Sequence, residues 1–287
     1  MNEDQTLNEE INIAEPQPDA KTAVIDAKSL NKRDWITIFV LALGIGAVLW
    51  GLIAPIGAGW GLWDWKAGLK GLSWSVFPGM LALLLGIFFI WRGKRKALPR
   101  RPLLWLGTLI GAAYTMWIIS LLLKAVSVPA IHDISTDLAD PPKFAVLTER
   151  ADNFDDIPGA EDGDMRGLNP QQRWVTIHQK EYGDIRSVRI AEPMGQVMEK
   201  ASRLAKERGW TVAADMPAEG RLEATATTAL FRFKDDIVLR VRPTEDGRGS
   251  IVDMRSVSRV GQSDIGVNAK RVRKFLADLS GTVTAAG

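Results

Sequence analysis

The sequence predicts an α+β protein, with three N-terminal transmembrane helices followed by a soluble domain built on an antiparallel β-sheet and two packed helices. Two observations support this prediction. Residues 35–123 hold nearly all the long apolar runs and nine of the 11 Trp residues. Residues 124–287 instead hold 24 of the 36 basic and 25 of the 34 acidic residues. Their short alternating segments, joined by turns and bracketed by helical patterns, are typical of an antiparallel α+β domain.

The composition excludes several kinds of site and partner. The chain has no Cys, which rules out disulfides, zinc–cysteine sites and a cysteine nucleophile. Its formal net charge is only +2, so it lacks the strongly basic face that nucleic-acid recognition needs. We expect no nucleic-acid partner, and no motif indicates a cofactor.

Residues 1–34 are polar and mostly acidic, and they show no period that would bury one face. We interpret them as a disordered cytoplasmic tail. They are too long and too acidic to be the basic start of a signal peptide.

Three apolar runs without an ionised side chain follow, at residues 35–54, 74–91 and 103–123. About 20 residues at a rise of 1.5 Å cross a hydrocarbon core of about 30 Å. One central charge costs about 2.5–3.5 kcal/mol, so three clean runs predict three spans and make the lipid bilayer a partner.

The loops between the runs predict the orientation. Residues 92–101 contain six basic and no acidic residues, whereas residues 55–73 contain only Lys66, Lys70 and Asp64. The positive-inside rule then places the tail and the 92–101 loop in the cytoplasm. The expected localisation is a bacterial inner membrane, multi-pass, with residues 124–287 as a periplasmic domain. The Trp-rich stretch of the 55–73 loop suits the headgroup level.

The start of the soluble region has no regular period. Residues 127–137 indicate an extended linker that lies on the domain. Residues 149–170 are rich in Asp, Glu, Gly and Pro and predict a mobile acidic surface loop. Their carboxylates lack the spacing of an EF-hand.

Regular elements are predicted from residue 193 onward. An amphipathic helix is expected at 193–208, because its apolar residues share one face. A last helix is expected at about 268–279. Four strands are predicted between them, with 234–236 and 245–249 as connections: about 210–214, 222–233, 237–242 and 251–259.

The densest polar segment is residues 253–269. Side chains alternate across a strand, so Asp253, Arg255 and Arg259 should share one face. Ser256 and Ser258 should lie on the other face.

Arg240 and Arg242 of the preceding strand would flank Asp253 and Arg255 if the two strands pair. A guanidinium offers paired donors to a carboxylate or phosphate. This pattern predicts a face that binds an anionic small molecule, a glycan or an envelope protein, with an internal ion-pair network as the alternative. The predicted ligand-binding residues are Arg240, Arg242, Asp253, Arg255, Arg259, Asp264 and Asn268. Asp264 or Asn268 could instead cap the last helix.

Catalysis has only a small set of candidates. The sequence has two His residues, His132 and His178. His132 lies beside Asp133, so a Ser–His–Asp set with Ser256 or Ser258 can be drawn. No Gly-x-Ser-x-Gly elbow is present. No catalytic residue is assigned, and His132, Asp133, Ser256 and Ser258 remain candidates.

No metal is expected. His132, Asp133 and Asp137 do not have a known ligand spacing. Asp235 and Asp236 fall on a predicted turn, where neighbouring carboxylates point apart, so a solvated turn or a helix cap is expected there.

Three motifs, in order, resemble the bacterial domain of unknown function 1499 family. They are His-Asp-Ile-Ser-Thr-Asp with Pro-Pro in residues 132–142, Phe-Arg-Phe-Lys-Asp-Asp in residues 231–236, and Asp-Met-Arg-Ser-Val-Ser-Arg-Val-Gly at the start of residues 253–269. The resemblance covers about residues 128–280, with 149–170 longer than the pattern needs. It implies a bacterial envelope protein, often membrane-anchored, without an assigned activity or catalytic residues. It also implies that residues 132–137 pack near residues 255–268.

We therefore expect an integral inner-membrane protein whose periplasmic domain binds an anionic envelope ligand or a protein partner. One alternative is an envelope hydrolase that uses His132 with Ser256 or Ser258. The other is a purely structural envelope domain.

Overall fold

The computed structural model describes residues 32–93 and 101–281. Most of the predicted tail and of the basic 92–101 loop therefore lies outside the described residues. The helices are α1 (Lys32–Gly59), α2 (Trp65–Trp74), α3 (Val76–Gly93), α4 (Arg101–Ser127), α5 (Pro170–Tyr182), α6 (Met194–Glu207) and α7 (Val267–Ser280). The strands are β1 (Asp133–Ser135), β2 (Val188–Ile190), β3 (Thr211–Met216), β4 (Arg221–Thr227), β5 (Lys234–Pro243) and β6 (Ser250–Ser258).

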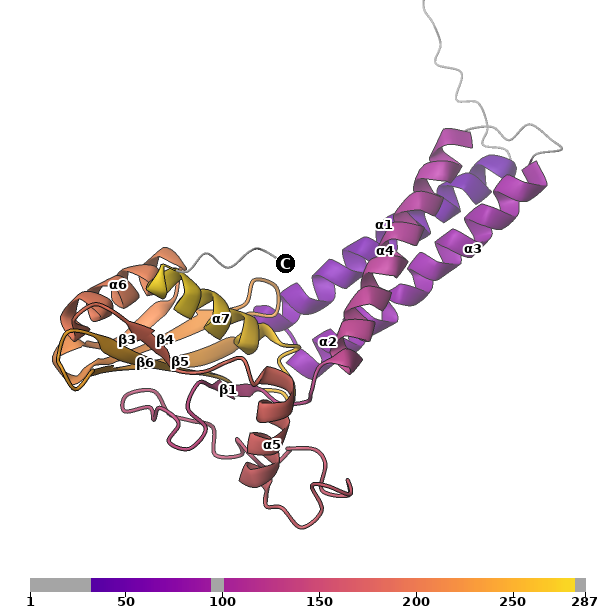
Figure 1. Cartoon of the computed structure of the whole chain (residues 1–287). Helices are drawn as coiled ribbons and strands as arrows, with labels where there is room; N and C mark the ends of the chain where they lie inside the picture. The colour runs from indigo at the N-terminus through magenta and orange to yellow at the C-terminus, as the bar shows by residue number, and fades with distance from the viewer. Residues whose placement is uncertain (1–31, 94–100, 282–287) are drawn as a thin grey trace, which may run out of the picture.

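The first part of the chain is a bundle of long apolar helices, which Figure 1 shows extending away from the sheet. Within residues 32–93 and 101–281, three stretches are long and apolar enough to cross a membrane: α1, α2 with α3, and α4. Glycines let the helices approach closely. A Cβ atom on Gly107 of α4 would lie 2.7 Å from the Cα atom of Leu41 in α1.

The predicted loop at 55–73 is partly helical. Helix α1 continues to Gly59, and α2 begins at Trp65. Asp64 caps α2 by accepting the Lys66 backbone N–H at 2.8 Å, which satisfies one of the free donors of the first turn. Trp63 folds back and donates its indole N–H to the Ala54 carbonyl at 2.9 Å.

The soluble domain is built on an antiparallel sheet with the strand order β1-β6-β5-β4-β3, and β2 also pairs with β6. Helices α6 and α7 cover one face (Figure 1). That face is apolar: Leu239, Met254 and Phe275 are almost completely buried in a single core. The predicted α+β class with an antiparallel sheet behind three apolar helices is confirmed.

The prediction of two packed helices was incomplete, because α5 forms a third helix. Asn169 and Gln172 form a reciprocal capping box at its start, which is a signal that the sequence carries. Its buried face includes Trp174, His178 and Tyr182. This mixture of aromatic and polar residues hides the apolar period that identifies a helix.

Two strand boundaries were wrong. Strand β4 ends at Thr227 rather than at residue 233. Arg232, in the loop that follows, has a positive φ of 52°, a conformation that a side chain rarely tolerates within a strand. Residues 234–236 are not a connection but the start of β5. Asp235 and Asp236 are buried there rather than solvated.

The predicted linker and acidic loop are both more integrated than expected. Residues 133–135 of the linker form β1 and pair with residues 255–257 of β6. In the 149–170 segment, which the structure shows as turns, Asn153 and Ile157 are buried. This segment is therefore anchored in the core at these points.

Candidate functional site

The face of the sheet opposite α6 and α7 is polar. In β5 and β6, Arg240 pairs with Asp253 and Arg242 pairs with Ile251, while Arg255 pairs with Val238. Paired residues point to the same face. The strand alternation predicted from the sequence is confirmed by this register.

Asp253 is completely buried and is surrounded by donors. It accepts hydrogen bonds from the Ser187 hydroxyl at 2.5 Å, from Arg240 at 3.1 Å and from Arg242 at 2.8 Å. A buried carboxylate requires such partners because its desolvation is costly. Asp253 is therefore the internal counter-ion that holds the two arginines in place.

Arg255 has a different set of partners. It is 4% exposed, and its guanidinium binds Asp133 at 2.6 Å and Glu149 at 2.7 Å. A further hydrogen bond goes to the Pro142 carbonyl. Burial favours a lower pKa for Arg255, but the two carboxylates more than offset it and raise that pKa. Arg255 is thus permanently charged and fully engaged.

The polar face is covered by the chain itself. We call residues 137–149 the strap. Arg240 holds one end of the strap through Asp137 and Asp140. The carboxylate of Glu223, which is completely buried on β4, accepts the backbone N–H groups of residues 145–147 at 2.6–3.0 Å.

The strap therefore occupies the surface that the sequence predicts for an anionic ligand. Its carboxylates and carbonyls meet the inner guanidinium groups of Arg240 and Arg255. What binds these two arginines is a segment of the same chain.

Arg259 is also paired, but at the surface. Its guanidinium makes two hydrogen bonds to Asp236, at 2.8 and 2.9 Å, and one to Thr225. The hydrogen bonds that Arg259 donates to Asp236 raise the pKa of Arg259, and partial burial opposes them only in part. Such a bidentate pair leaves little donor capacity for another anion.

We call Arg255, Arg240, Arg242 and the neighbouring Arg189 of β2 the arginine row; its outer end, at Arg242 and Arg189, remains open. The Arg242 side chain is 48% exposed, and only its Nη2 atom has a hydrogen-bond partner among the described residues, Asp253. Arg189 of β2 is exposed, pairs with Ile251 in the strand register and makes no ion pair within the parts of the chain that the structure describes. Arg189 and Arg242 thus stand on either side of Ile251. A groove of about 630 Å³ adjoins Ile251 on the Arg189 side; Arg189 and Arg248 line it together with Glu245 and Asp246, and Arg242 lies outside its lining.

Asp264 and Asn268 lie away from this row. Asp264 accepts the backbone N–H groups of Gly266 and Asn268, so it satisfies donors at the start of α7. Asn268 is buried and bridges the two serines: its Oδ1 atom accepts from Ser256 at 2.7 Å, and its Nδ2 atom donates to Ser258 at 2.9 Å. The predicted proximity of residues 132–137 to this segment is observed, because Nδ2 also donates to the carbonyl of His132.

The catalytic candidates are not assembled as a triad. The His132 imidazole contacts the Asn153 side chain at 3.1 Å, the Gln262 carbonyl at 3.3 Å and Arg150 at 3.4 Å. Within residues 32–93 and 101–281, no hydrogen bond joins this imidazole to a serine hydroxyl. Asp133, the proposed orienting acid, is instead bound to Arg255 and Asn153.

The second histidine, which the sequence reasoning left without a role, is buried in α5. The Nε2 atom of His178 accepts the Ser135 backbone N–H at 3.2 Å. Burial lowers its pKa to about 4, although Asp133 opposes this effect. His178 is therefore a neutral acceptor that fixes β1.

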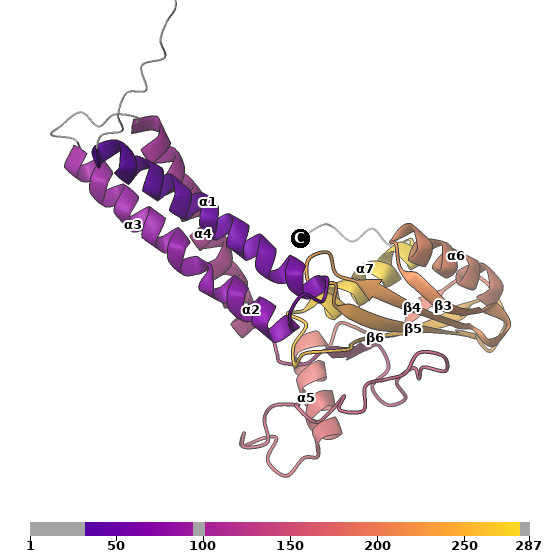
Figure 2. The ribbon, with the colours of Figure 1, turned by 180° about the vertical axis from the view of Figure 1, so that it is seen from behind.

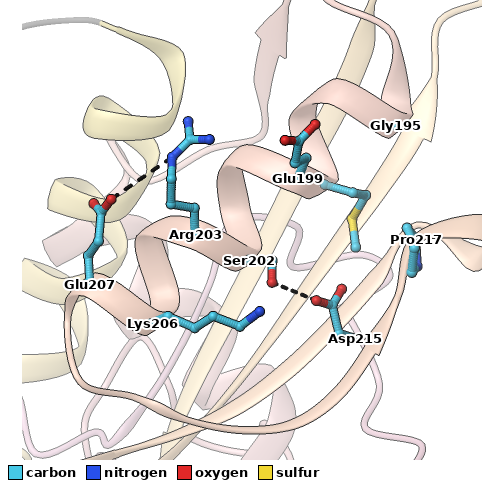
Figure 3. A pocket seen from close by; sticks show the side chains of 9 residues that line it. Gly195, Glu199, Ser202, Arg203, Lys206, Glu207, Asp215 and Pro217 are labelled. Atoms are coloured by element: carbon cyan, nitrogen blue, oxygen red, sulfur yellow. Dashed lines mark hydrogen bonds and ion pairs between the residues drawn. The ribbon is translucent and has the colours of Figure 1, made fainter.

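A separate hollow of about 640 Å³ lies between α6 and the edge strand β3. Figure 3 shows Ser202 of α6 pointing toward Asp215 of β3, with a hydrogen bond of 2.5 Å between them. Acidic and basic side chains both line this hollow, so it has no preference for one sign of charge. In the described part of the chain, no group of three or more His, Asp or Glu residues is arranged to hold a metal ion.

Comparison with known families gives one match. The profile of the family described as "Protein of unknown function (DUF1499)" matches residues 133–279, just over half of the chain. The matched region begins at β1 and ends inside α7, so it covers the sheet, the strap and the arginine row. A search of curated protein sequences finds no match.

Proposed function

Since this chain belongs to the DUF1499 family of proteins of unknown function, we propose from its geometry that it is a membrane-anchored, non-catalytic envelope protein. Its domain binds an anionic ligand, and the binding site is the open end of the arginine row at Arg189 and Arg242.

The arrangement of these two arginines carries the proposal. Both are cross-strand partners of Ile251, one on each side. Neighbouring strands lie about 4.8 Å apart, so the two Cα atoms are separated by about 10 Å and both side chains rise from the same face. Two long guanidinium side chains at that spacing can close on one carboxylate or phosphate group.

The inner arginines are assigned a structural role. Arg240 and Arg255 are bound by carboxylates of the strap and of the sheet. A ligand would have to displace those partners, whereas at Arg242 it meets free donors. Of the four arginines predicted from the sequence, the proposed site includes only Arg242. Arg189 is added to it.

The location belongs to the same proposal. Three helices are long and apolar enough to cross a membrane, and the basic residues cluster between the second and third. The positive-inside rule supports a location of the domain on the periplasmic side of a bacterial inner membrane. The acidic polymers and glycans of an envelope carry the negative charge that complements these two arginines.

The test is a binding assay on the full chain in neutral detergent micelles, with inorganic phosphate and oligogalacturonate as probes. Their affinities are measured by calorimetry for the wild type and for the Arg189→Gln/Arg242→Gln double variant. The matched control is Arg203→Gln/Lys206→Gln on α6. A hydrogen bond to a charged group contributes about 1.5–3 kcal/mol, so we expect the double variant to lose at least about tenfold in affinity.

The binding assay has two distinct negative outcomes. An unchanged affinity in the double variant would remove the site from this position. If neither probe binds the wild type, the domain is purely structural and the proposal is wrong. The hydrolase alternative receives no support from the positions of His132, Ser256 and Ser258.

A further inference from the structure

The domain rests on the end of the helix bundle, as both Figure 1 and Figure 2 show. The loop between β4 and β5 makes the first contact. A Cβ atom on Gly59, the last residue of α1, would lie 2.5 Å from the Leu230 carbonyl oxygen. The ring of Phe233 packs edge-on against Trp65 of α2, with 6.0 Å between ring centroids.

A second loop reaches the end of α4. Ser263 donates to the Pro129 carbonyl at 3.4 Å, just beyond that helix. A Cβ atom on Gly266 would lie 3.8 Å from Val128. The β4–β5 loop and the loop before α7 are therefore both held at the level where the apolar helices end.

Exposed apolar side chains gather at this level. Beyond residue 128, the large apolar residues that are exposed among the described residues are Val146, Leu230, Val260, Ile265 and Val267. All except Val146 belong to these two loops or to the first residue of α7. On the bundle side, Trp60 is 76% and Leu62 is 73% exposed. We call the following set the collar: Trp60, Leu62, Trp63, Leu230, Val260, Ile265 and Val267.

Basic side chains accompany the collar. Lys66 and Lys70 lie on the first two turns of α2, Lys124 on the last turn of α4, and Arg232 and Lys234 in and after the β4–β5 loop. All five are exposed, and none forms an ion pair with another residue that the structure describes. The Arg232 side chain is fixed close to the end of α1, 3.1 Å from the position of a Cβ atom on Gly59.

We propose that the collar lies in the headgroup layer of the membrane that the helices cross, and that these cations bind the phosphates of anionic phospholipids in the leaflet facing the domain. Two features support this partner over another protein. The collar continues the apolar surface of the spans, and Trp residues favour the headgroup level. Lys and Arg extend their charged ends to that level from apolar stems, and each contributes about fivefold to the attraction to anionic lipid.

This surface lies away from Arg189 and Arg242, so the inference does not depend on the proposed ligand. Of the basic residues in 92–101, the two that the structure describes, Arg92 near the end of α3 and Arg101 at the start of α4, lie at the opposite end of the spans. They remain unchanged in every variant below, so any lipid that they bind contributes equally to all measurements.

The test uses the full chain in neutral detergent micelles, titrated with phosphatidylglycerol and followed by native mass spectrometry. The collar variant is Lys66→Gln/Lys70→Gln/Arg232→Gln. The control removes three cations elsewhere: Lys180→Gln/Arg203→Gln/Lys206→Gln. We expect the collar variant to bind phosphatidylglycerol at least tenfold more weakly than the wild type, and the control to match the wild type. Equal binding by the collar variant would overturn the proposal.

A second measurement needs no variant and therefore holds even if the collar variant fails to fold. Hydrogen exchange of the wild type is compared in nanodiscs of phosphatidylcholine and in nanodiscs that also contain phosphatidylglycerol. We expect several-fold slower exchange in residues 228–234 and 260–266 when the anionic lipid is present. Equal exchange in both discs would assign the collar to a different partner and overturn the proposal.

Discussion

The guanidinium of Arg255 binds both carboxylate oxygens of Asp133, with Nε–Oδ1 and Nη2–Oδ2 distances of 3.0 and 2.6 Å, across 122 positions of sequence. Both side chains are buried. The pair joins the first strand of the domain to the last one. The pair also holds Arg255 in position, and Arg255 in turn binds Glu149, the last residue of the strap.

We predict that Arg255→Ala lowers the free energy of unfolding by about 3–5 kcal/mol, because the buried Asp133 loses its counter-ion. Thermal and denaturant unfolding of the full chain in neutral detergent measure this change. The matched control is Arg273→Ala, whose pair with Asp184 is exposed on both sides, at 41% and 59%, and should cost no more than about 1 kcal/mol. Equal effects of the two substitutions would contradict the structural role given to Arg255.

The strap depends on Glu223. This carboxylate accepts three consecutive backbone N–H groups, so Glu223→Ala should release the middle of the strap and cost about 1–3 kcal/mol. We predict that trypsin then cleaves after Lys143 at least about tenfold faster, since proteolysis follows the population of the open form. Glu199→Ala, an exposed change on α6, provides the control, and a cleavage rate equal to that of the wild type would count against the strap.

The burial of His178 predicts a pH dependence of stability. The pKa of His178 is lowered from 6.5 to about 4 in the folded state, so as the pH falls the unfolded chain takes up the proton first. The contribution of His178 is therefore fully present above pH 6.5 and is lost as the pH falls from 6.5 to 4, with a slope of at most about 1.4 kcal/mol per pH unit. His178→Gln keeps an acceptor for the Ser135 N–H but does not titrate. The difference in unfolding free energy between wild type and variant should be constant above pH 7 and should decline below it; a constant difference down to pH 4 would refute the assignment.

The contact between bundle and domain predicts a steric effect. A Cβ atom on Gly68 of α2 would lie 3.1 Å from the Phe231 ring and 2.7 Å from Ala58. Gly68→Leu should therefore displace the β4–β5 loop and speed hydrogen exchange in residues 228–233 by several-fold. At Gly46 a Cβ atom would meet nothing within 4 Å, so Gly46→Leu should leave that loop unchanged. If both variants exchange like the wild type, the loop is not held by α2.

Local patterns in the sequence predicted much of this architecture. Long runs without charge identified the three apolar helices, and alternation along residues 253–259 placed Asp253, Arg255 and Arg259 on one face. The sequence placed Arg240 and Arg242 beside Asp253 and Arg255 on the condition that the two strands pair, and they do pair. These features depend on neighbours in the chain or on adjacent strands, so a single sequence carries them.

The remaining features depend on contacts that periodicity does not encode. Asp133 and Glu149, the partners of Arg255, lie in segments predicted as a linker and a mobile loop. Phe231 and Phe233 resemble strand residues, but their rings stack on each other, with 4.8 Å between centroids, beside α2. The strap was not predicted, because Glu223 binds its backbone N–H groups. Almost every residue has such a group, so the side chains of the strap do not indicate this contact.

The pairing of β1 with β6 sets the order of events in the biosynthesis of the domain. Residues 133–135 are synthesised first, and their partners at 255–257 follow more than a hundred residues later. Likewise, the carbonyl of His132 can accept its hydrogen bond only once Asn268 has been synthesised. Contacts between distant segments form only after the intervening chain is available. The domain therefore closes only after its synthesis is nearly complete. A chain cut short before β6 leaves β1 without its partner strand, so such a product lacks the contact that joins the two ends of the domain.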